Sequence, residues 1–274
     1  MLTCGSWEIY RDEQERINKS DCGSQSGKLR KFMLKNMIKR TAGRAGLYLE
    51  VTGYNLKIIF ANKFIFFLLG AVVFYLLITV IDLLNPETYF SEADLYNLLL
   101  FPGLLIIFYP SAFGIQNDVD TRMIEVLFGI PDYRYKVWFV RLVNIFILVY
   151  LILLSLTFLS SVALIPVPVF SFTLQLMFPV FFMGAFGFML STVIRNGNGT
   201  AAVLVLIGLV FWISSGILGE NEWNIFLNPY RFPDTLTQTM WQEMLFYNRL
   251  YLTVGIALAL LAGLFRLQKR EKYV

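Results

Sequence analysis

Charged residues are missing from five intervals of the sequence that approach or exceed the length of a membrane-spanning helix. The uncharged runs comprise 18 residues after Lys63, 23 after Asp94, 24 after Arg195 and 16 after Arg249. A membrane helix needs about 20 mostly apolar residues. The fifth run, residues 142–194, has 53 uncharged residues, which suits two crossings joined at Pro166-Val167-Pro168. The sequence therefore predicts six spans.

The composition is typical of an integral membrane protein, because 57% of the residues are hydrophobic, 15% are charged and the mean hydropathy is +0.62. We expect an all-α integral membrane protein with a polar N-terminal segment (1–30), a basic amphipathic elbow region (31–63), a six-helix transmembrane domain (64–266) and a C-terminal tail (267–274). The expected spans are 64–82, 96–117, 138–165, 169–194, 199–219 and 249–266, with one sizeable outer segment at 222–247.

The basic residues favour one orientation. With both termini inside, the inner segments hold 21 Lys and Arg against 11 acidic residues, whereas the outer loops hold 2 against 8. Cytoplasmic loops of membrane proteins carry the excess of Lys and Arg. Both termini are therefore predicted to be cytoplasmic, in the cytoplasmic (inner) membrane of a bacterial cell.

The segment before the first span predicts contact with membrane lipids. Residues 28–63 carry nine Lys and Arg, and an apolar stripe recurs at helical spacing, namely Leu47, Val51, Tyr54 and Ile58. A basic helix with one apolar face lies in the headgroup region of a bilayer. The alternative is a cytosolic helix that packs on a partner protein. Nucleic-acid binding is not expected, because topology already accounts for these charges.

The sequence lacks the features that usually serve in catalysis or in ion-coupled transport. The chain has no His, and only Lys63, Asp82 and Arg141 touch the ends of the expected spans, whose interiors we expect to be free of charge. Cys4 and Cys22 are interpreted as free cytosolic thiols, and no metal site is expected. The phosphate-binding loop of ATPases is also absent. We expect no enzyme activity and no bound cofactor in this chain.

The internal loop after the second expected span has features of a docking segment. Ile124, Leu127 and Phe128 form an apolar face, and Pro131 ends the short helix expected here. Asp118 favours its positive N-terminal end. A helix with an exposed apolar face is suited to a groove in another protein.

This loop resembles the segment between the second and third spans of type 2 ATP-binding-cassette exporter permeases. That family shows a Glu, a Pro six residues later, an Arg three further on and a basic residue seven beyond. The matching residues here are Glu125, Pro131, Arg134 and Arg141. Arg122-Met123 stands where the family often has a Gly-Thr pair. The elbow region, the six spans and Asn228-Pro229 are also similar to the family pattern.

The resemblance implies a half-transporter with a coupling helix at 118–131 and an outer segment, 222–247, that is re-entrant. A second copy of the chain, or a paralogous permease, would complete the translocation pathway as a homodimer or heterodimer. Two ATPase subunits, which bind ATP and Mg²⁺, would dock on the 118–135 loop. The coupling residues would be Asp118, Arg122, Ile124, Glu125, Leu127, Phe128, Pro131, Arg134 and Arg141.

Other interpretations stay open at this point. Glu125 and Arg134 also fit a solvated surface pair, and Arg141 also fits a positive-inside anchor. The whole chain also fits a non-transporting membrane scaffold or assembly factor, or a carrier or channel that works alone. The transported substrate, whether drug, lipid, glycan or another molecule, does not follow from the sequence.

Two further sets of residues are candidates for the pathway and for helix packing. Prolines 102 and 110 predict kinks in the second span, and kinks open space between helices. The candidate lining residues are Phe101, Phe108, Tyr109, Phe113, Phe211, Trp212 and Ser215, for which the alternatives are lipid-facing or core positions. Gly255, Ala259 and Gly263 form a small-residue stripe suited to close packing, within one chain or between two.

Overall fold

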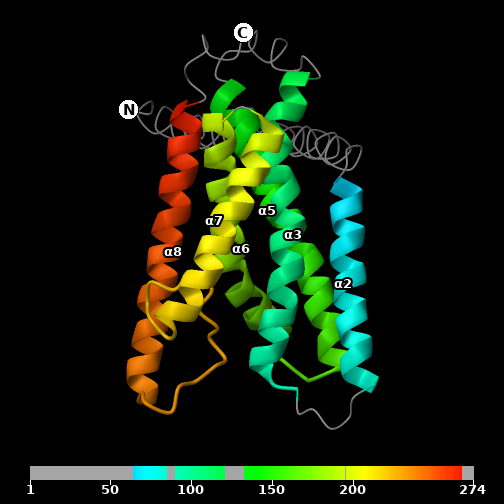
Figure 1. Ribbon diagram of the computed structural model, residues 1–274, viewed down its shortest axis with the longest axis vertical. Coiled ribbons are helices and arrows are strands. Elements are labelled where there is room, and N and C mark those ends of the chain that lie inside the picture. Colours follow the sequence, from blue (N-terminus) through cyan, green and yellow to red (C-terminus); the bar gives the residue numbers. More distant parts are fainter. Residues whose placement is uncertain (1–63, 85–89, 121–132, 195, 267–274) are drawn as a thin grey trace, which may run out of the picture. The chain divides into compact units, whose positions relative to one another are not determined.

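The computed structural model describes residues 64–84, 90–120, 133–194 and 196–266, with side chains described at all of these positions except 117–120 and 133–138. Across these ranges it contains six α-helices and no strand. The helices are α2 (Phe64–Leu84), α3 (Glu92–Asp120), α5 (Tyr133–Ala163), α6 (Val169–Ile194), α7 (Gly197–Leu218) and α8 (Gln238–Arg266) (Figure 1).

Each of the six helices contains a segment long and apolar enough to cross a bilayer. The prediction of an all-helical, multi-pass membrane fold is therefore confirmed for the described part of the chain. The N-terminal segment 1–30, the elbow region 31–63, the tail 267–274 and most of the coupling helix expected at 118–131 lie outside the described residues.

Several predicted boundaries differ from the observed ones, and two of these differences concern the expected coupling and re-entrant segments. Helix α3 continues through Asp120, so the first three residues of the expected coupling helix belong to α3. Helix α8 begins at Gln238 instead of 249, and it includes the second part of the segment that we expected to be re-entrant. The first part, 222–237, consists of turns and irregular chain. The predicted start of this helix is too late because the span was predicted from the uncharged run that begins after Arg249.

Helix α6 lies at the centre of the contacts between helices. It packs on α3, α5, α7 and α8, whereas α2 packs chiefly on α3. In Figure 1, α2 in cyan and α8 in orange and red accordingly lie on opposite sides of α3 and α6. The loop at 219–237 lies at the end of the bundle where α3 begins. Helix α7 is the least buried of the six, so most of its surface faces outward.

Hydroxyl groups link the helices inside the bundle. Tyr75 of α2 and Ser160 of α5 share a hydrogen bond of 2.8 Å between buried side chains. The hydroxyl of Thr173 in α6 lies 3.1 Å from that of Thr157 in α5. Because lipid offers no competing water, such bonds between helices help to align membrane spans.

The small-residue stripe of α8 packs within the chain, against α6. A Cβ atom at Gly255 would lie 2.7 Å from the Phe182 ring, and one at Gly263 would lie 2.6 Å from the Phe188 ring. Ala259, between them, is buried. These small residues let α8 approach the aromatic side chains of α6 closely.

We expect Gly263→Val to lower the midpoint of thermal unfolding of the detergent-purified protein. The new side chain meets the buried Phe188 ring, and overpacking of this kind costs about 1–3 kcal/mol. Gly114→Val in α3 is the matched control, because no atom lies within 4 Å of a Cβ placed there. Equal midpoints for the two variants would contradict this account of the α6–α8 contact.

Candidate functional site

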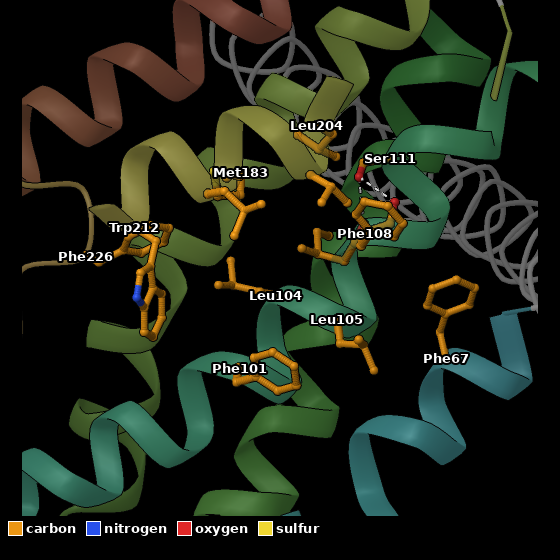
Figure 2. Close-up of a pocket in the computed structure, with 14 residues that line it drawn as sticks. Phe67, Phe101, Leu104, Leu105, Phe108, Ser111, Met183, Leu204, Trp212 and Phe226 are labelled. Atoms are coloured by element: carbon orange, nitrogen blue, oxygen red, sulfur yellow. Dashed lines mark hydrogen bonds between the residues drawn. The ribbon is translucent and has the colours of Figure 1, made fainter. Parts of the chain in front are cut away.

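An apolar cavity of about 460 Å³ lies over α3, between α2 and α7. Both flanking helices pack on α3, and α6 closes the inner side with Met183. Figure 2 shows side chains from these helices around the space, with Trp212 and Phe226 together at one end. The α3 residues that line it are Phe101, Leu104, Leu105, Ile107, Phe108 and Ser111. The α7 residues are Leu204, Val205, Gly208, Leu209 and Trp212.

The wall of this cavity offers almost no hydrogen bond to a ligand. Ser111 supplies its one side-chain hydroxyl, and that hydroxyl donates to the backbone oxygens of Ile107 at 2.7 Å and Phe108 at 3.0 Å. These two bonds stay inside α3 and bridge the turn that contains Pro110 (Figure 2). The space is therefore suited to hydrocarbon or to aromatic groups.

A second cavity, the polar cavity, has a volume of about 580 Å³ and a wall that is about half polar, and it lies toward the 219–237 loop. Its lining comes from the beginning of α3, the end of α7 and the loop. The residues are Asn97, Leu100, Trp212, Ser215, Gly216, Gly219, Glu220, Asn224, Phe226, Leu227, Asn228 and Arg231. Trp212 and Phe226 line both cavities, with ring centroids 6.2 Å apart.

Three asparagines hold the loop in place through backbone groups. The Asn224 amide donates to Gly219 O at 2.7 Å, and the Asn228 amide donates to Ala93 O of α3 at 2.8 Å. The Asn248 amide, from α8, donates to the carbonyl oxygens of residues 222 and 224 at 2.7 and 2.8 Å. The loop is thereby tied to both α3 and α8, and these amide groups are already engaged.

Arg249 is a charged residue that is buried within α8. Only 8% of its surface is exposed, and it lies in the interior of the helix, where the sequence predicted the edge of a span. Its guanidinium donates to Gln175 Oε1 of α6 at 2.9 Å, to Asn248 Oδ1 at 3.1 Å and to Leu227 O at 3.5 Å. It also lies 5.2 Å from the centre of the Phe178 ring. These contacts keep all three guanidinium nitrogens bonded away from water.

Tyr230 completes the anchoring of the loop. Its ring stacks on Phe172 of α6, with centroids 4.6 Å apart. Burial raises the pKa of Tyr230 to about 12, and the negative charge of Glu92 acts in the same direction. The phenol therefore stays neutral at physiological pH, as its position against an apolar ring requires.

The structure divides the seven candidate pathway residues into two groups. Phe101, Phe108 and Trp212 line the apolar cavity, and Trp212 and Ser215 line the polar one. Tyr109 instead packs against Phe67 of α2 and against Phe113, at 5.1 and 5.2 Å between ring centroids. Phe211 packs against Phe182 and Phe186 of α6. Tyr109, Phe113 and Phe211 are not part of the lining of either cavity. Successive helical residues differ by about 100° in direction, so neighbours in the sequence lie on different faces of the helix.

The aliphatic part of the lining was not among the residues predicted from the sequence. Leu104 and Leu105 continue the stripe from Phe101 to Phe108 at helical spacing. Choosing candidates by their position on one face of the helix, and not by their aromatic character, would have included both leucines. Phe226 belongs to the loop, and no local pattern in the sequence places it against Trp212.

The coupling candidates mostly lie beyond what the structure describes. Arg122, Ile124, Glu125, Leu127, Phe128 and Pro131 fall outside the described residues, and Asp118 and Arg134 lie on α3 and α5 without a described side chain. Arg141 is half-buried in α5, near Pro110 and Gly114 of α3. Among the described residues, no group of three or more His, Cys, Asp or Glu side chains is placed to hold a metal ion.

No family model matches the chain, and neither a curated protein nor a solved structure matches it.

We expect Arg249→Met to loosen the 219–237 loop and to speed its cleavage by trypsin after the exposed Arg231. Methionine fills much of the space but leaves acceptors on Gln175, Asn248 and Leu227 without their donor, at about 1–3 kcal/mol for each buried group. Mass spectrometry of the purified protein would measure the rate of cleavage.

Arg266→Met is the matched control for this experiment, because Arg266 is an exposed arginine at the other end of α8. The same cleavage rate in both variants and the parent protein would show that Arg249 does not anchor the loop.

Proposed function

We propose that this chain is the membrane-spanning permease subunit of an ATP-driven exporter, and that a separate ATPase subunit docks on its 118–135 loop. The spacing of Glu125, Pro131, Arg134 and Arg141 carries the proposal, because it matches the coupling loop of type 2 exporter permeases. One structural observation supports it. Helix α3, which supplies the largest share of the apolar cavity wall, runs without interruption to Asp120, directly before this loop.

A contact at the end of α3 would pass motion of the loop to a second wall of the cavity. Gln116 Oε1 accepts a hydrogen bond from the backbone N–H of Gly197, the first residue of α7. The Phe113 ring lies so close to Gly197 that a Cβ atom there would collide with it. Displacement of the α3 terminus would therefore move α7 as well, and these helices together provide most of the cavity lining.

The proposed energy source lies in the partner. This chain has no phosphate-binding loop, so ATP and Mg²⁺ would be bound by two ATPase subunits. A second copy of the chain, or a paralogous permease, would complete the pathway. The residues of this chain would bind the substrate and transmit motion, and they would carry out no bond-breaking chemistry.

The charge distribution supports an orientation for this assembly. The described residues at the end of the bundle with the 219–237 loop include seven acidic residues and two arginines, Arg231 and Arg249. The positive-inside rule favours this end outside the cell and the coupling loop in the cytoplasm. The two cavities would then lie one above the other, with the polar cavity toward the outer surface.

We expect the affinity-tagged chain to co-purify with an ATP-binding-cassette subunit from its native membrane. In reconstituted vesicles, Glu125→Ala and Arg134→Ala should lower ATP turnover and ATP-dependent transport severalfold, because they remove charges from the docking loop. Membrane insertion should be unchanged. Glu243→Ala is the control, since it removes an exposed acidic side chain near the beginning of α8.

Three results would contradict the proposal. Full ATP turnover in both loop variants would remove the coupling role. Flux through the purified chain alone would indicate a stand-alone carrier or channel. A bound cytosolic protein without ATPase activity, and without transport, would indicate a scaffold.

A further inference from the structure

The two cavities adjoin at a pair of aromatic side chains. Trp212 of α7 and Phe226 of the loop contribute to both walls, so no other layer of the protein separates the two spaces there. Figure 2 shows this pair at one end of the apolar cavity. Volumes of about 460 and 580 Å³ each fall within the range of about 300–1,000 Å³ that is usual for small-molecule sites.

One face of α7 forms a wall of both cavities. Gly208, Trp212 and Gly216 are spaced four residues apart, so they lie on the same side of the helix. Gly208 lines the apolar cavity and Gly216 the polar one. A Cβ at Gly208 would approach only the methyl group of Met183, at 3.6 Å, and a Cβ at Gly216 would meet nothing within 4 Å. The absent side chains leave one hollow on each side of Trp212.

The distance along this face suits one elongated molecule. Eight residues separate Gly208 from Gly216. At a rise of 1.5 Å per residue, these positions are about 12 Å apart along the axis of α7. A ligand that spans both hollows must therefore be extended, and it must pass beside Trp212 and Phe226.

The chemistry changes sharply between the two hollows. The apolar cavity has Ser111 as its one hydroxyl side chain, and that hydroxyl is hydrogen-bonded to the backbone of its own helix. In the polar cavity, Asn224 and Asn228 are engaged in holding the loop, but the lining also includes Asn97, Ser215, Glu220 and Arg231. A cavity lined by both a basic and an acidic residue complements a ligand that carries both signs of charge.

We propose that the paired cavities bind a zwitterionic amphiphile, with its hydrocarbon chain against Gly208 and its headgroup against Gly216. Arg231 faces the anionic part of the headgroup and Glu220 the cationic part. Asn97 and Ser215 supply neutral hydrogen bonds. The inference deepens the proposed function, because it names the substrate class of the exporter, but the binding itself requires no ATPase.

The test uses the full chain, purified in detergent, and two photoreactive probes. The first is a lysophosphatidylethanolamine whose acyl chain ends in a diazirine. The second is a fatty alcohol of the same chain length with the same diazirine. Mass spectrometry locates the labelled residues, and competition with unlabelled lysophosphatidylethanolamine gives the apparent affinity.

We expect saturable labelling of the apolar cavity by the zwitterionic probe, at an affinity about tenfold or more above that of the alcohol. Gly208→Leu and Gly216→Leu should each weaken that binding about tenfold or more, because one fills the chain cavity and the other the headgroup cavity. Gly114→Leu, in open space outside both cavities, should bind as the parent protein does. Arg231→Ala, on the exposed loop, is a second test of headgroup recognition if a glycine variant fails to fold.

Other outcomes overturn the inference. Loss of binding in Gly208→Leu alone would mean that only a bilayer lipid chain enters from the side. Equal labelling by the two probes would exclude headgroup recognition, and unchanged binding in both glycine variants would exclude the site. Failure of the proposed function is distinguished separately: binding as expected, together with no ATPase subunit co-purifying from the native membrane, would uphold the amphiphile site and contradict the exporter function.

Discussion

The close packing of α3 against α6 determines where the cavities lie. A Cβ atom at Gly184 of α6 would collide with Ile107, one at Gly187 would collide with Ser111, and one at Gly103 of α3 would collide with Val180. Helices that lack side chains at their contact can approach closely without any hydrophobic driving force from water. One side of α3 packs against α6, and α2 and α7 pack on other parts of its surface. The apolar cavity is the space that these two helices leave over α3.

The bilayer also explains the polar end of the molecule. A buried arginine in a membrane protein is costly unless its guanidinium is hydrogen-bonded, and Arg249 donates to acceptors on α6, on α8 and on the loop. The same residues that accommodate this charge therefore fix the loop across the end of the bundle. Asn224 and Asn228 also hold the loop through backbone groups, and both residues line the polar cavity as well.

Features that depend on neighbouring residues could be predicted from the sequence, and features that depend on residues far apart in the chain could not. The six helices could be predicted because the length of an apolar span depends only on local composition. The start of α8 could not, since the partners of Arg249 lie 74 residues away at Gln175 and 22 residues away at Leu227. For the site, aromatic content identified Phe101, Phe108 and Trp212 but also Tyr109 and Phe211, which face other helices. The spacing of Gly208, Trp212 and Gly216 is visible in the sequence, but only packing shows which face of α7 borders empty space.

In the proposed exporter, an attached ATPase would change the separation of the helices around the apolar cavity. Spin labels on cysteines at Leu69 of α2 and Leu206 of α7, two exposed positions, would report that separation by pulsed electron resonance in a chain with Cys4 and Cys22 replaced by serine. The account predicts two distance distributions in the complex with its ATPase, one without nucleotide and another with ATP bound. A single distribution that ATP leaves unchanged would contradict it.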